Sequence, residues 1–463
     1  MFKLKQLIVR DILEATKGEL KYGNVDMVVK NISTDSRSVN EGDLFIPIEG
    51  EKFDGHAYIK DAIRGGATCI LASKDSFIEN VLDVSVIKVR DTREAYLDIA
   101  RYYRQKFNIS IIGVVGSVGK TSTKDMIASV LGTKLNVLKT KGNLNNDIGV
   151  PRTVLEIDDS DDVAIIEMGM NHKGEISKLT RVVMPDYVVI SNIGVSHIEN
   201  LGSRYNILKA KLEVLEGLNK SGVVFLNKDD DMLSGAIDEI GFEVVTYGIK
   251  SDCDYRAINI KDNGEDGINF DISLGGRIYN IEIKAVGMHN VYNALAGIAV
   301  GMKLGIPIHD IILGISNFKS GKMRLNIDDR LGVKIINDSY NASPDSMKAA
   351  IDVLDTVSKS RRSIAVLGDM LELGDFSKDE HRKIGEYINE KDIDCVVTVG
   401  NDSEYIAKEL LNRGHLDIYS FPSNRDTTEF LNDFIKKDDV ILFKGSRGMK
   451  LEEIITGLDE VRG

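Results

Sequence analysis

The chain has 463 residues, of which 43% are hydrophobic and 28% charged. This is the composition of a globular protein, and the length exceeds what one hydrophobic core supports, so two to four domains are expected. The 59 basic and 72 acidic residues give a formal net charge of −13, which argues against a general nucleic-acid-binding protein or a membrane-surface protein.

The cysteines and the N-terminal sequence indicate in which cellular compartment the protein is found. Cys69, Cys253 and Cys395 are far apart and lack the spacing of metal ligands, so we expect reduced thiols. The chain has no signal-peptide core and no run of about 18 apolar residues. We therefore expect a cytoplasmic protein that does not insert into a membrane.

Residues 1–107 have the pattern of a small α/β unit. Short apolar runs at 43–48, 69–72 and 86–89 predict strands, and an amphipathic helix is predicted from Tyr96 to Phe107. This helix leads directly into the next strand.

A glycine-rich segment follows that strand. The apolar run Ile109–Ile112 predicts a buried strand, Asp125–Leu131 predicts a helix, and Gly113–Ser122 lies between them. A strand, a glycine loop, a Lys-Thr pair and a helix form the layout of a phosphate-binding loop, whose backbone N–H groups and helix N-terminus hold phosphate oxygens. Position 114 is valine where the usual spacing has glycine, so an incidental turn is the alternative. The predicted nucleotide-binding residues are Gly116, Ser117, Val118, Gly119, Lys120, Thr121 and Ser122.

The next strands are expected to form a parallel sheet. The runs at 163–168 and 187–192 are continuously apolar, as in strands covered on both faces, and the runs at 223–226 and 244–247 extend the series. A more alternating stretch from about 254 to 286 predicts antiparallel strands at one edge. A helix rich in alanine is then predicted from Asn290 to Leu304.

Two polar residues follow neighbouring strands of this predicted sheet. Glu167 ends the strand at 163–168, and His197 follows the strand at 187–192. Because the carboxyl ends of parallel strands meet at one edge, both are candidate magnesium ligands near the phosphate loop. The alternatives are a solvated glutamate and a structural histidine.

The predicted helix 207–218 places Lys209 and Lys211 on different faces. Four charged residues recur at helical spacing and predict a solvated stripe: Lys209, Glu213, Glu216 and Lys220. Lys211 lies instead on the apolar face with Ile207 and Leu215. A buried lysine has a lowered pKa and can act as a neutral nucleophile, whereas a snorkelling lysine keeps its ammonium in water. Position alone favours snorkelling.

A segment dense in amides lies at 143–151. It is either a plain loop or a set of fixed amide groups that contact a polar substrate, through Asn143, Asn145 and Asn146.

The last third of the chain predicts a second doubly wound sheet. Strands are expected at 333–336, 362–367, 394–399 and 439–443, with helices between them. Lys319–Arg324 is the expected hinge, and Asp345 and Ser346 are the expected cap of a helix at 347–354. The predicted fold is α/β with three domains: a small N-terminal domain (1–107), a central P-loop domain with helices on both faces of a parallel sheet (108–315), and a C-terminal Rossmann-like domain (316–463).

Taken together, several segments resemble the Mur ligases of peptidoglycan synthesis. The similar segments are Ser33–Arg37, the phosphate loop with its glycine offset, Gly142–Pro151, Gly287–Asn293 and Asp338–Pro344. The last of these is most similar to the branch that adds D-alanyl-D-alanine. The resemblance implies ATP and Mg²⁺ as cofactors, and UDP-MurNAc-tripeptide and D-Ala-D-Ala as substrates of a ligase that works through an acyl phosphate. We expect the protein to be a monomer.

The same resemblance implies roles for single residues. Ser36 and Arg37 hold the uridine nucleotide, and Asn143, Asn145 and Asn146 face the muramyl substrate. His289 and Asn290 lie near ATP. Asn290, Arg324, Asn341 and Lys444 make ATP and closure contacts. Lys211 is carbamylated, which converts a cation into a metal-binding anion. The implied metal ligands are Thr121, Glu167, His197 and Lys211, and the catalytic residues are Lys120, Lys211 and His197.

Several alternatives stay open. Within the family, the chain could add a diamino acid to UDP-MurNAc-dipeptide. Folylpolyglutamate synthase is a further possibility, although the Asp35–Arg37 segment counts against it. A nucleotide-hydrolysing switch would need no carboxylate or amine, and a UDP-sugar-binding protein would leave the phosphate loop unexplained.

Overall fold

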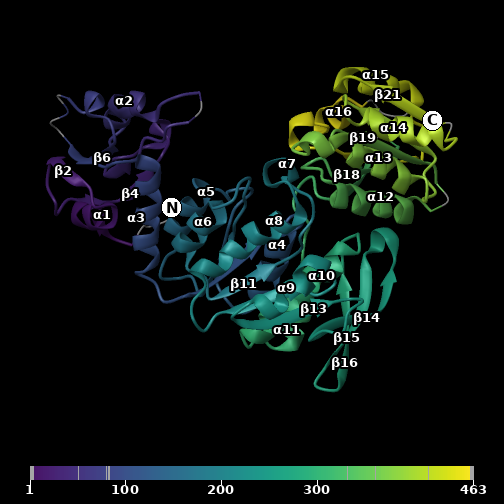
Figure 1. Cartoon of the computed structure of the whole chain (residues 1–463), viewed down its shortest axis with the longest axis horizontal. Coiled ribbons are helices and arrows are strands. Elements are labelled where there is room, and N and C mark those ends of the chain that lie inside the picture. Colours follow the sequence, from purple (N-terminus) through teal and green to yellow (C-terminus); the bar gives the residue numbers. More distant parts are fainter. Residues whose placement is uncertain are drawn as a thin grey trace.

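The computed structural model describes residues 5–50, 52–79, 81, 84–330, 332–359, 361–415 and 417–458. The described chain forms three successive α/β parts, and the central part lies between the other two (Figure 1). This arrangement confirms the predicted fold class. Each of the three larger sheets lies within one of the domain ranges that we propose from the sequence.

The N-terminal part is built on a five-stranded sheet. Its strand order is β2 (Glu19–Tyr22), β7 (Ser85–Lys88), β6 (Cys69–Ala72), β5 (Asp43–Phe45) and β4 (Asn31–Ser33), and β2 alone of these strands is antiparallel to its neighbour. A two-stranded ladder of β1 (Leu7–Ile8) and β3 (Val28–Val29) lies beside α1 (Val9–Thr16). Helix α2 (Ile59–Arg64) packs on one face, and the long helix α3 (Thr92–Arg104) packs against both α1 and the central part.

The central sheet has nine strands. Six are parallel: β9 (Val137–Lys139), β10 (Val163–Glu167), β8 (Ser110–Val115), β11 (Tyr187–Ile190), β12 (Val223–Asn227) and β13 (Glu243–Gly248). The sheet continues through β14 (Tyr255–Asp262), β15 (Ile268–Leu274) and β16 (Arg277–Ile283), where the last two pairings are antiparallel. The predicted antiparallel edge is thus confirmed.

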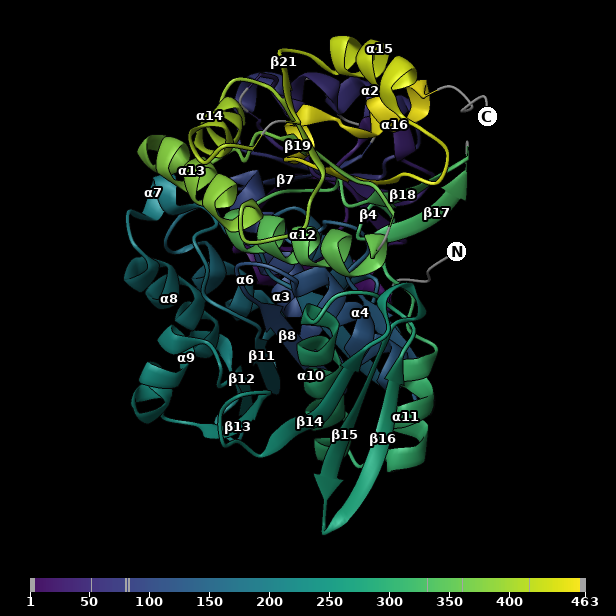
Figure 2. The ribbon, with the colours of Figure 1, turned by 90° about the vertical axis from the view of Figure 1, so that its right-hand side faces the viewer.

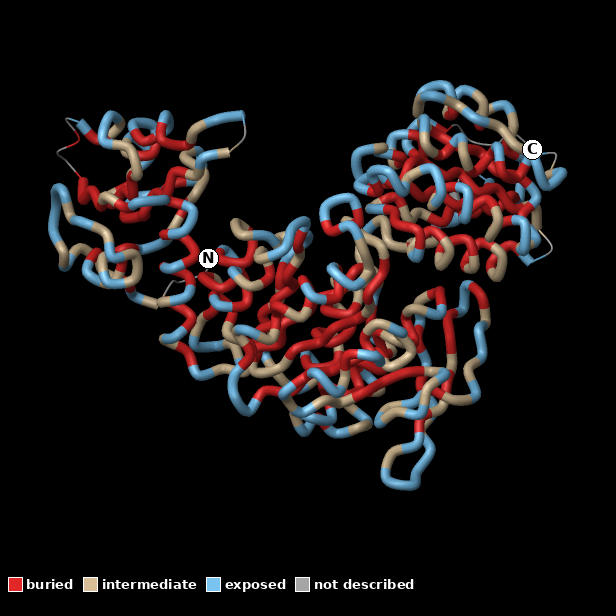
Figure 3. The backbone as a smooth tube through the Cα atoms, in the orientation of Figure 1, coloured by how far each residue is buried: buried red, intermediate tan, exposed pale blue. Residues whose placement is uncertain are grey.

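Helices cover both faces of the central sheet (Figure 2). One face packs on α4 (Lys120–Leu131), α10 (His289–Lys303) and α11 (Ile308–Ser316). The other packs on α5 (Gly149–Leu155), α6 (Glu175–Val183), α8 (Arg204–Leu212) and α9 (Asp231–Ala236). Neighbouring residues of β8 therefore enter different cores: Ile111 and Val115 join one, and Ile112 and Val114 the other. This double burial explains why the strands are continuously apolar. Figure 3 shows that buried residues are concentrated inside each of the three parts.

The C-terminal part is a second doubly wound unit. Its strand order is β17 (Asn326–Arg330), β18 (Val333–Asn337), β22 (Val440–Lys444), β19 (Ser363–Gly368), β20 (Cys395–Val399) and β21 (Ile418–Phe421), with only β17 antiparallel. Helices α12 (Pro344–Ser358), α13 (Ser377–Ile388) and α14 (Glu404–Asn412) cover one face. Helices α15 (Asn424–Phe434) and α16 (Glu452–Gly457) cover the other.

Two local predictions need correction. The helix expected at 207–218 is α-helical only to Leu212 and continues as a 3₁₀ turn, Glu213–Gly217. Glu213 is buried, not solvated, because its carboxylate accepts hydrogen bonds from the Gly174 and Ser177 N–H groups at the start of α6. A carboxylate at a helix N-terminus satisfies otherwise unpaired N–H groups and the helix dipole.

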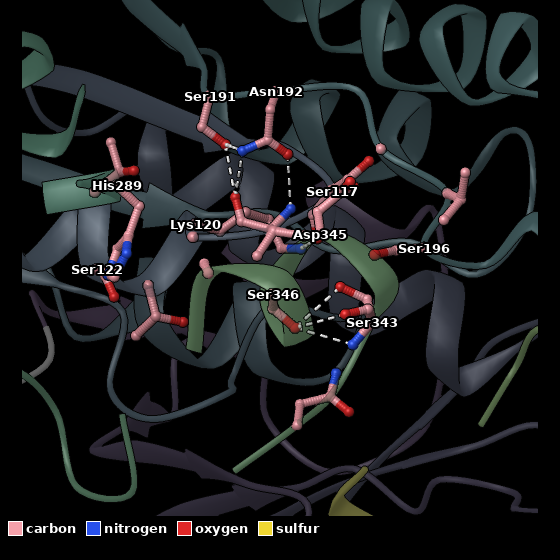
Figure 4. Close-up of a pocket in the computed structure, with 18 of the residues that line it drawn as sticks. Ser117, Lys120, Ser122, Ser191, Asn192, Ser196, His289, Ser343, Asp345 and Ser346 are labelled. Carbon is pink, nitrogen blue, oxygen red and sulfur yellow. Dashed lines mark hydrogen bonds between the residues drawn. The ribbon is translucent and has the colours of Figure 1, made fainter. Parts of the chain in front are cut away.

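The cap of α12 also differs from the prediction. The N-cap residue is Ser343, whose N–H donates to Ser346 Oγ at 2.9 Å (Figure 4). Ser346 therefore belongs to the cap as expected, but Asp345 does not. Asp345 Oδ2 lies instead against Gly194, where a Cβ would come within 2.2 Å of it.

The topology places a binding site at β8. This strand lies between β10 and β11, and the chain reaches these two neighbours in opposite directions from it. Ligands of doubly wound sheets bind at the carboxyl ends of strands at such a switch point. None of the described helices is both long enough and apolar enough to cross a membrane.

Candidate active site

The phosphate loop leaves β8 at Gly116 and enters α4 at Lys120. Gly116 has φ 159° and Gly119 has φ 79°, which are conformations that other residues rarely adopt. A Cβ at Gly116 would lie 2.0 Å from Ser191 Oγ. Gly113 lies inside β8, where a Cβ would meet Met168 Cε at 2.8 Å. The loop glycines are therefore Gly116 and Gly119, and Gly113 is a packing position, which explains the unusual spacing.

Two side chains beyond β11 hold the loop in shape (Figure 4). Val118 N–H donates to Asn192 Oδ1 at 2.9 Å, and Asn192 Nδ2 donates back to the Val118 carbonyl at 2.8 Å. Ser191 Oγ donates to the same carbonyl at 3.0 Å. The neighbouring strand thus fixes the loop from outside, so its N–H groups are held ready for phosphate oxygens.

Two lysines meet at one carbonyl group of the loop. Lys120 Nζ donates to the Gly116 carbonyl at 2.9 Å, and Lys211 Nζ donates to the same oxygen at 3.0 Å. Lys211 is only 2% exposed, so it is buried and does not snorkel. Burial lowers the pKa of Lys211 well below its usual value, and the charge of Lys120 lowers it further. Lys211 thus lies on the apolar face as predicted, but the snorkelling that its position alone favoured is wrong, because the amine itself is buried. This amine is suited to act in the neutral form.

Glu167, at the end of β10, lies in a polar network with an unused acceptor. Its Oε1 accepts from Asn145 Nδ2 at 2.8 Å, while its Oε2 is buried without a hydrogen-bond partner among the described groups. Lys124 Nζ lies 3.7 Å from Oε2 and donates to the Thr140 carbonyl at 2.7 Å. A buried, unpartnered carboxylate oxygen facing the phosphate loop is a suitable Mg²⁺ ligand.

His197 lies between β11 and the short helix α7 (Ile198–Leu201), with φ 63°. Its Nδ1 is 2.7 Å from Glu372 Oε2, which comes from the C-terminal part. Thr121, Glu167 and His197 line one cavity, whereas Lys211 lies behind the loop. Among the described residues, no three His, Cys, Asp or Glu side chains form a metal-binding group on their own. A metal at Glu167 or His197 would therefore need further ligands, such as hydroxyl, phosphate or carbamate oxygens.

The cavity has a volume of about 920 Å³ and lies between the central and C-terminal parts. The predicted site residues that line it are Ser117, Val118, Gly119, Lys120, Thr121, Ser122, Asn143, Asn145, Glu167, His197, His289, Arg324 and Asn341. Those that do not line it are Gly116, Asn146, Lys211, Asn290, Ser36 and Arg37. Most residues expected to contact the nucleotide are thus brought together from segments far apart in sequence.

Arg324 connects the two parts across this cavity. Its Nη2 donates to Thr121 Oγ1 at 3.2 Å, and its guanidinium lies 4.1 Å from the centre of the Tyr340 ring. The residues on either side of Arg324, Met323 and Leu325, have φ 57° and 53°. These left-handed conformations lie where the chain passes from the segment expected to be the hinge into β17.

Lys444 holds the loop after β18. It is 1% exposed, and its Nζ lies 2.5 Å from Asp338 Oδ2 and donates to the Asn341 carbonyl at 3.0 Å. The ion pair anchors the segment that brings Tyr340 and Asn341 to the cavity. Lys444 itself also reaches the cavity lining.

The start of α10 separates two residues predicted to lie near ATP. His289 lines the cavity, and its Nδ1 is buried without a described hydrogen-bond partner. Burial lowers the pKa of His289, so its ring favours the neutral form. Asn290 turns away: its Nδ2 donates to the Val286 carbonyl at 2.8 Å, and its Oδ1 accepts from Asn293 Nδ2 at 3.0 Å.

The asparagines of the amide-rich loop at 143–151 differ in role: two make hydrogen bonds within the protein, and one is exposed to the cavity. Asn145 binds Glu167, and Asn146 Oδ1 accepts from the Gly149 N–H at 2.9 Å at the start of α5. Asn143 is exposed and lines the cavity. The loop is therefore more ordered than a plain connection, and Asn143 is its amide most available to a ligand.

Ser36 and Arg37 lie in the N-terminal part, in a 3₁₀ turn at 36–38. Arg37 Nε and Nη2 donate to the Asp35 carboxylate at 2.9 and 2.8 Å. These hydrogen bonds lower the pKa of Asp35 to about 2. The Arg37 side chain is 87% exposed, so it is accessible to a ligand bound on this part.

Sequence reasoning missed Lys124, Asn192 and the contact of Glu372. Lys124 could have been found by the argument used for Lys211, because it shares a helical face with Ile127 and Leu131. Asn192 and Glu372 follow strands, but nothing local shows which distant group each one contacts.

Comparison with known proteins finds similarity to one enzyme family along nearly the whole chain. The family models that match are described as Mur ligase family, catalytic domain (residues 28–104), Mur ligase middle domain (114–301) and Mur ligase, glutamate ligase domain (323–447). The UDP-N-acetylmuramoyl-tripeptide–D-alanyl-D-alanine ligase of Bacillus subtilis is 41% identical over 98% of both chains. That of Escherichia coli is 34% identical over 97% of both.

Solved structures are similar over nearly the full length. A crystal structure of MurF from Acinetobacter baumannii has a TM-score of 0.91 and 30% identity, covering 98% of this chain and 99% of that one. MurF ligase from Thermotoga maritima in complex with ADP has a TM-score of 0.81 and 27% identity, covering 92% and 96%.

Proposed function

Because this chain belongs to the Mur ligase family, we propose that it is an ATP-dependent ligase joining D-alanyl-D-alanine to UDP-N-acetylmuramoyl-tripeptide, which makes the pentapeptide precursor of peptidoglycan. The observation that carries this function is the full-length similarity to ligases of that name, together with a phosphate loop that opens onto an interdomain cavity. A relative of known structure holds ADP, which supports the nucleotide assignment.

The reaction requires activation of a carboxylate. A carboxylate oxygen of the tripeptide attacks the γ-phosphorus of ATP, the bond to ADP breaks, and an acyl phosphate forms. The amine of D-Ala-D-Ala then attacks the carbonyl carbon, phosphate leaves, and the nitrogen loses a proton. Positioning and charge neutralisation dominate such a transfer.

The residues of the cavity suit these tasks. The N–H groups of the loop hold the phosphates, and Lys120 stabilises charge on the transferred group. Arg324 and Asn341 bring the C-terminal part to the nucleotide, and His289 lines the same cavity. Closure of the C-terminal part is expected to exclude water from the acyl phosphate.

We assign two divalent-metal positions to the same cavity. Thr121 and Glu167 are proposed to hold one Mg²⁺, and His197 and Lys211 a second. Bound there, Mg²⁺ supplies positive charge to the phosphate oxygens. Lys211 must be modified before it can bind a metal ion. Its neutral nitrogen attacks CO₂, a C–N bond forms as one C–O π bond breaks, and a proton leaves to solvent, which produces a carbamate anion.

We also propose that the protein acts in the cytoplasm as a monomer. The described cysteines, Cys69, Cys253 and Cys395, are all free, which suits a reducing compartment.

The function is tested by phosphate release from Mg-ATP with UDP-MurNAc-tripeptide, with and without D-Ala-D-Ala. We expect release that needs both substrates and yields the pentapeptide. Release that ignores both would indicate a nucleotide-hydrolysing switch. Release only with UDP-MurNAc-dipeptide and a diamino acid would indicate the Mur ligase that adds the diamino acid.

A further inference from the structure

His197 and Glu372 form a contact between two separate parts of the chain. His197 follows β11 of the central part, and Glu372 follows β19 of the C-terminal part. His197 Nδ1 and Glu372 Oε2 are 2.7 Å apart. Both residues line the cavity that also contains Lys120 and Thr121.

The backbone on both sides of this contact is strained. His197 has φ 63° and Glu372 has φ 64°, although neither residue is glycine. Non-glycine residues in this region persist where the surrounding structure holds them, and they are concentrated at functional sites. The sequence segments on either side therefore direct these two side chains toward each other at a conformational cost.

The two loops also approach each other closely. Helix α7 directly follows His197 and packs against the 3₁₀ turn Gly374–Phe376, which follows Glu372. Figure 1 shows α7 beside the C-terminal part. A Cβ at Gly374 would lie 2.8 Å from Glu199 Cγ. The contact therefore forms part of an interface that brings the C-terminal part against the edge of the central sheet.

The chemistry of a metal-binding histidine explains the carboxylate. A histidine that binds metal through one ring nitrogen usually donates the N–H of the other to a carboxylate or carbonyl, which fixes the tautomer and the ring orientation. Nδ1 of His197 is buried and makes no aligned hydrogen bond to a described group, and the Glu372 carboxylate is the charged group beside it. A hydrogen bond from Nδ1 to this carboxylate would leave Nε2 for the metal.

We propose that Glu372 is a positioning residue for His197, and that contact between the C-terminal part and the central part thereby strengthens metal binding at the second divalent-metal position. This inference rests on the proposed function, which assigns His197 as a metal ligand. Because the same contact takes part in domain closure and in metal binding, closure raises the affinity for the metal, and metal binding favours closure by the same factor.

The test counts metal ions in the full-length enzyme. Mn²⁺ binding is measured by electron paramagnetic resonance of free Mn²⁺, with a non-hydrolysable ATP analogue present. We expect two Mn²⁺ per chain in the wild type. In Glu372→Gln, we expect one ion bound normally and the other about 10- to 100-fold more weakly, as is usual when the outer partner of a metal ligand is removed.

A matched control and a second readout separate this role from a general effect. Asp375→Asn makes the same charge change on an exposed position of the same loop and should bind Mn²⁺ like the wild type. Small-angle scattering should show that Mn²⁺ contracts the nucleotide-bound wild type but contracts Glu372→Gln less.

The possible results are distinct. Unchanged affinity for both ions in Glu372→Gln, with normal contraction, would overturn the role of Glu372 while leaving the proposed ligase function intact. Equal weakening in Asp375→Asn would also overturn it, because charge alone would then explain the effect. A wild type that binds fewer than two ions would overturn the metal assignment itself.

Discussion

The amines of Lys120 and Lys211 donate hydrogen bonds to one carbonyl oxygen, that of Gly116, at 2.9 and 3.0 Å. Two ammonium groups this close repel each other strongly in a buried site. Lys120 is the one that lines the cavity, whereas Lys211 lies behind the loop. The arrangement therefore favours a charged Lys120 for phosphate and a neutral Lys211 for modification.

The first prediction concerns this buried amine. Lys211→Ala should fold but lose the ligase reaction, because the carbamate oxygens proposed for the metal cannot form. Lys209→Ala is the matched control, since Lys209 is exposed on the same helix and its amine lies over the Tyr205 ring. Product formation and thermal unfolding are measured on both variants, and full activity of Lys211→Ala would refute the carbamate hypothesis.

The second prediction is the pH dependence of the carbamate. Its formation needs the neutral amine, and the pKa of Lys211 in the folded protein is well below the usual lysine value. The carbamate should therefore persist to a lower pH than an exposed lysine would allow, and should be lost as pH falls through that lowered pKa. With ¹³C-bicarbonate, a carbamate resonance should appear in the wild type and in Lys209→Ala. Its persistence in Lys211→Ala would assign it to another group.

The third prediction distinguishes the loop glycine Gly116 from Gly113, which lies inside β8. Gly116→Ala should weaken nucleotide binding by more than about tenfold, or about 1.4 kcal/mol, because its Cβ would displace Ser191 from the Val118 carbonyl. Gly113→Ala should cost about 1 kcal/mol of stability and leave nucleotide affinity unchanged, since only the flexible end of Met168 must move. Titration with a fluorescent ATP analogue compares the two, and equal affinities would contradict our assignment.

The fourth prediction tests the support of Glu167. Lys124→Met should destabilise the protein by about 3 kcal/mol, because it removes the positive charge 3.7 Å from a buried carboxylate. Adding Glu167→Gln should recover much of that loss, since the second change removes the uncompensated charge. Lys139→Met is the control, because Lys139 is partly exposed and pairs with Asp125 instead. Denaturant unfolding measures all of them, and additive losses in the double variant would exclude the coupling.

Much of the fold followed from local patterns. Continuously apolar runs marked β8, β10, β11 and β12 because a parallel strand is covered on both faces, and the alternating stretch marked the antiparallel edge. The predicted ends of elements were less accurate. Glu213 shows why: its helical spacing suggested solvent, but the N-terminus of α6 gave its carboxylate a better partner inside the protein.

The sequence by itself determined the phosphate loop, the α/β class, the family and the apolar-face position of Lys211, because each depends on spacing along one segment. Only the tertiary structure decided that Lys211 meets Lys120 at Gly116, that Asn145 and Lys124 support Glu167, and that Glu372 reaches His197. These contacts join residues far apart in sequence. Such contacts depend on strand order and on the packing of one domain against another, and no local pattern encodes either.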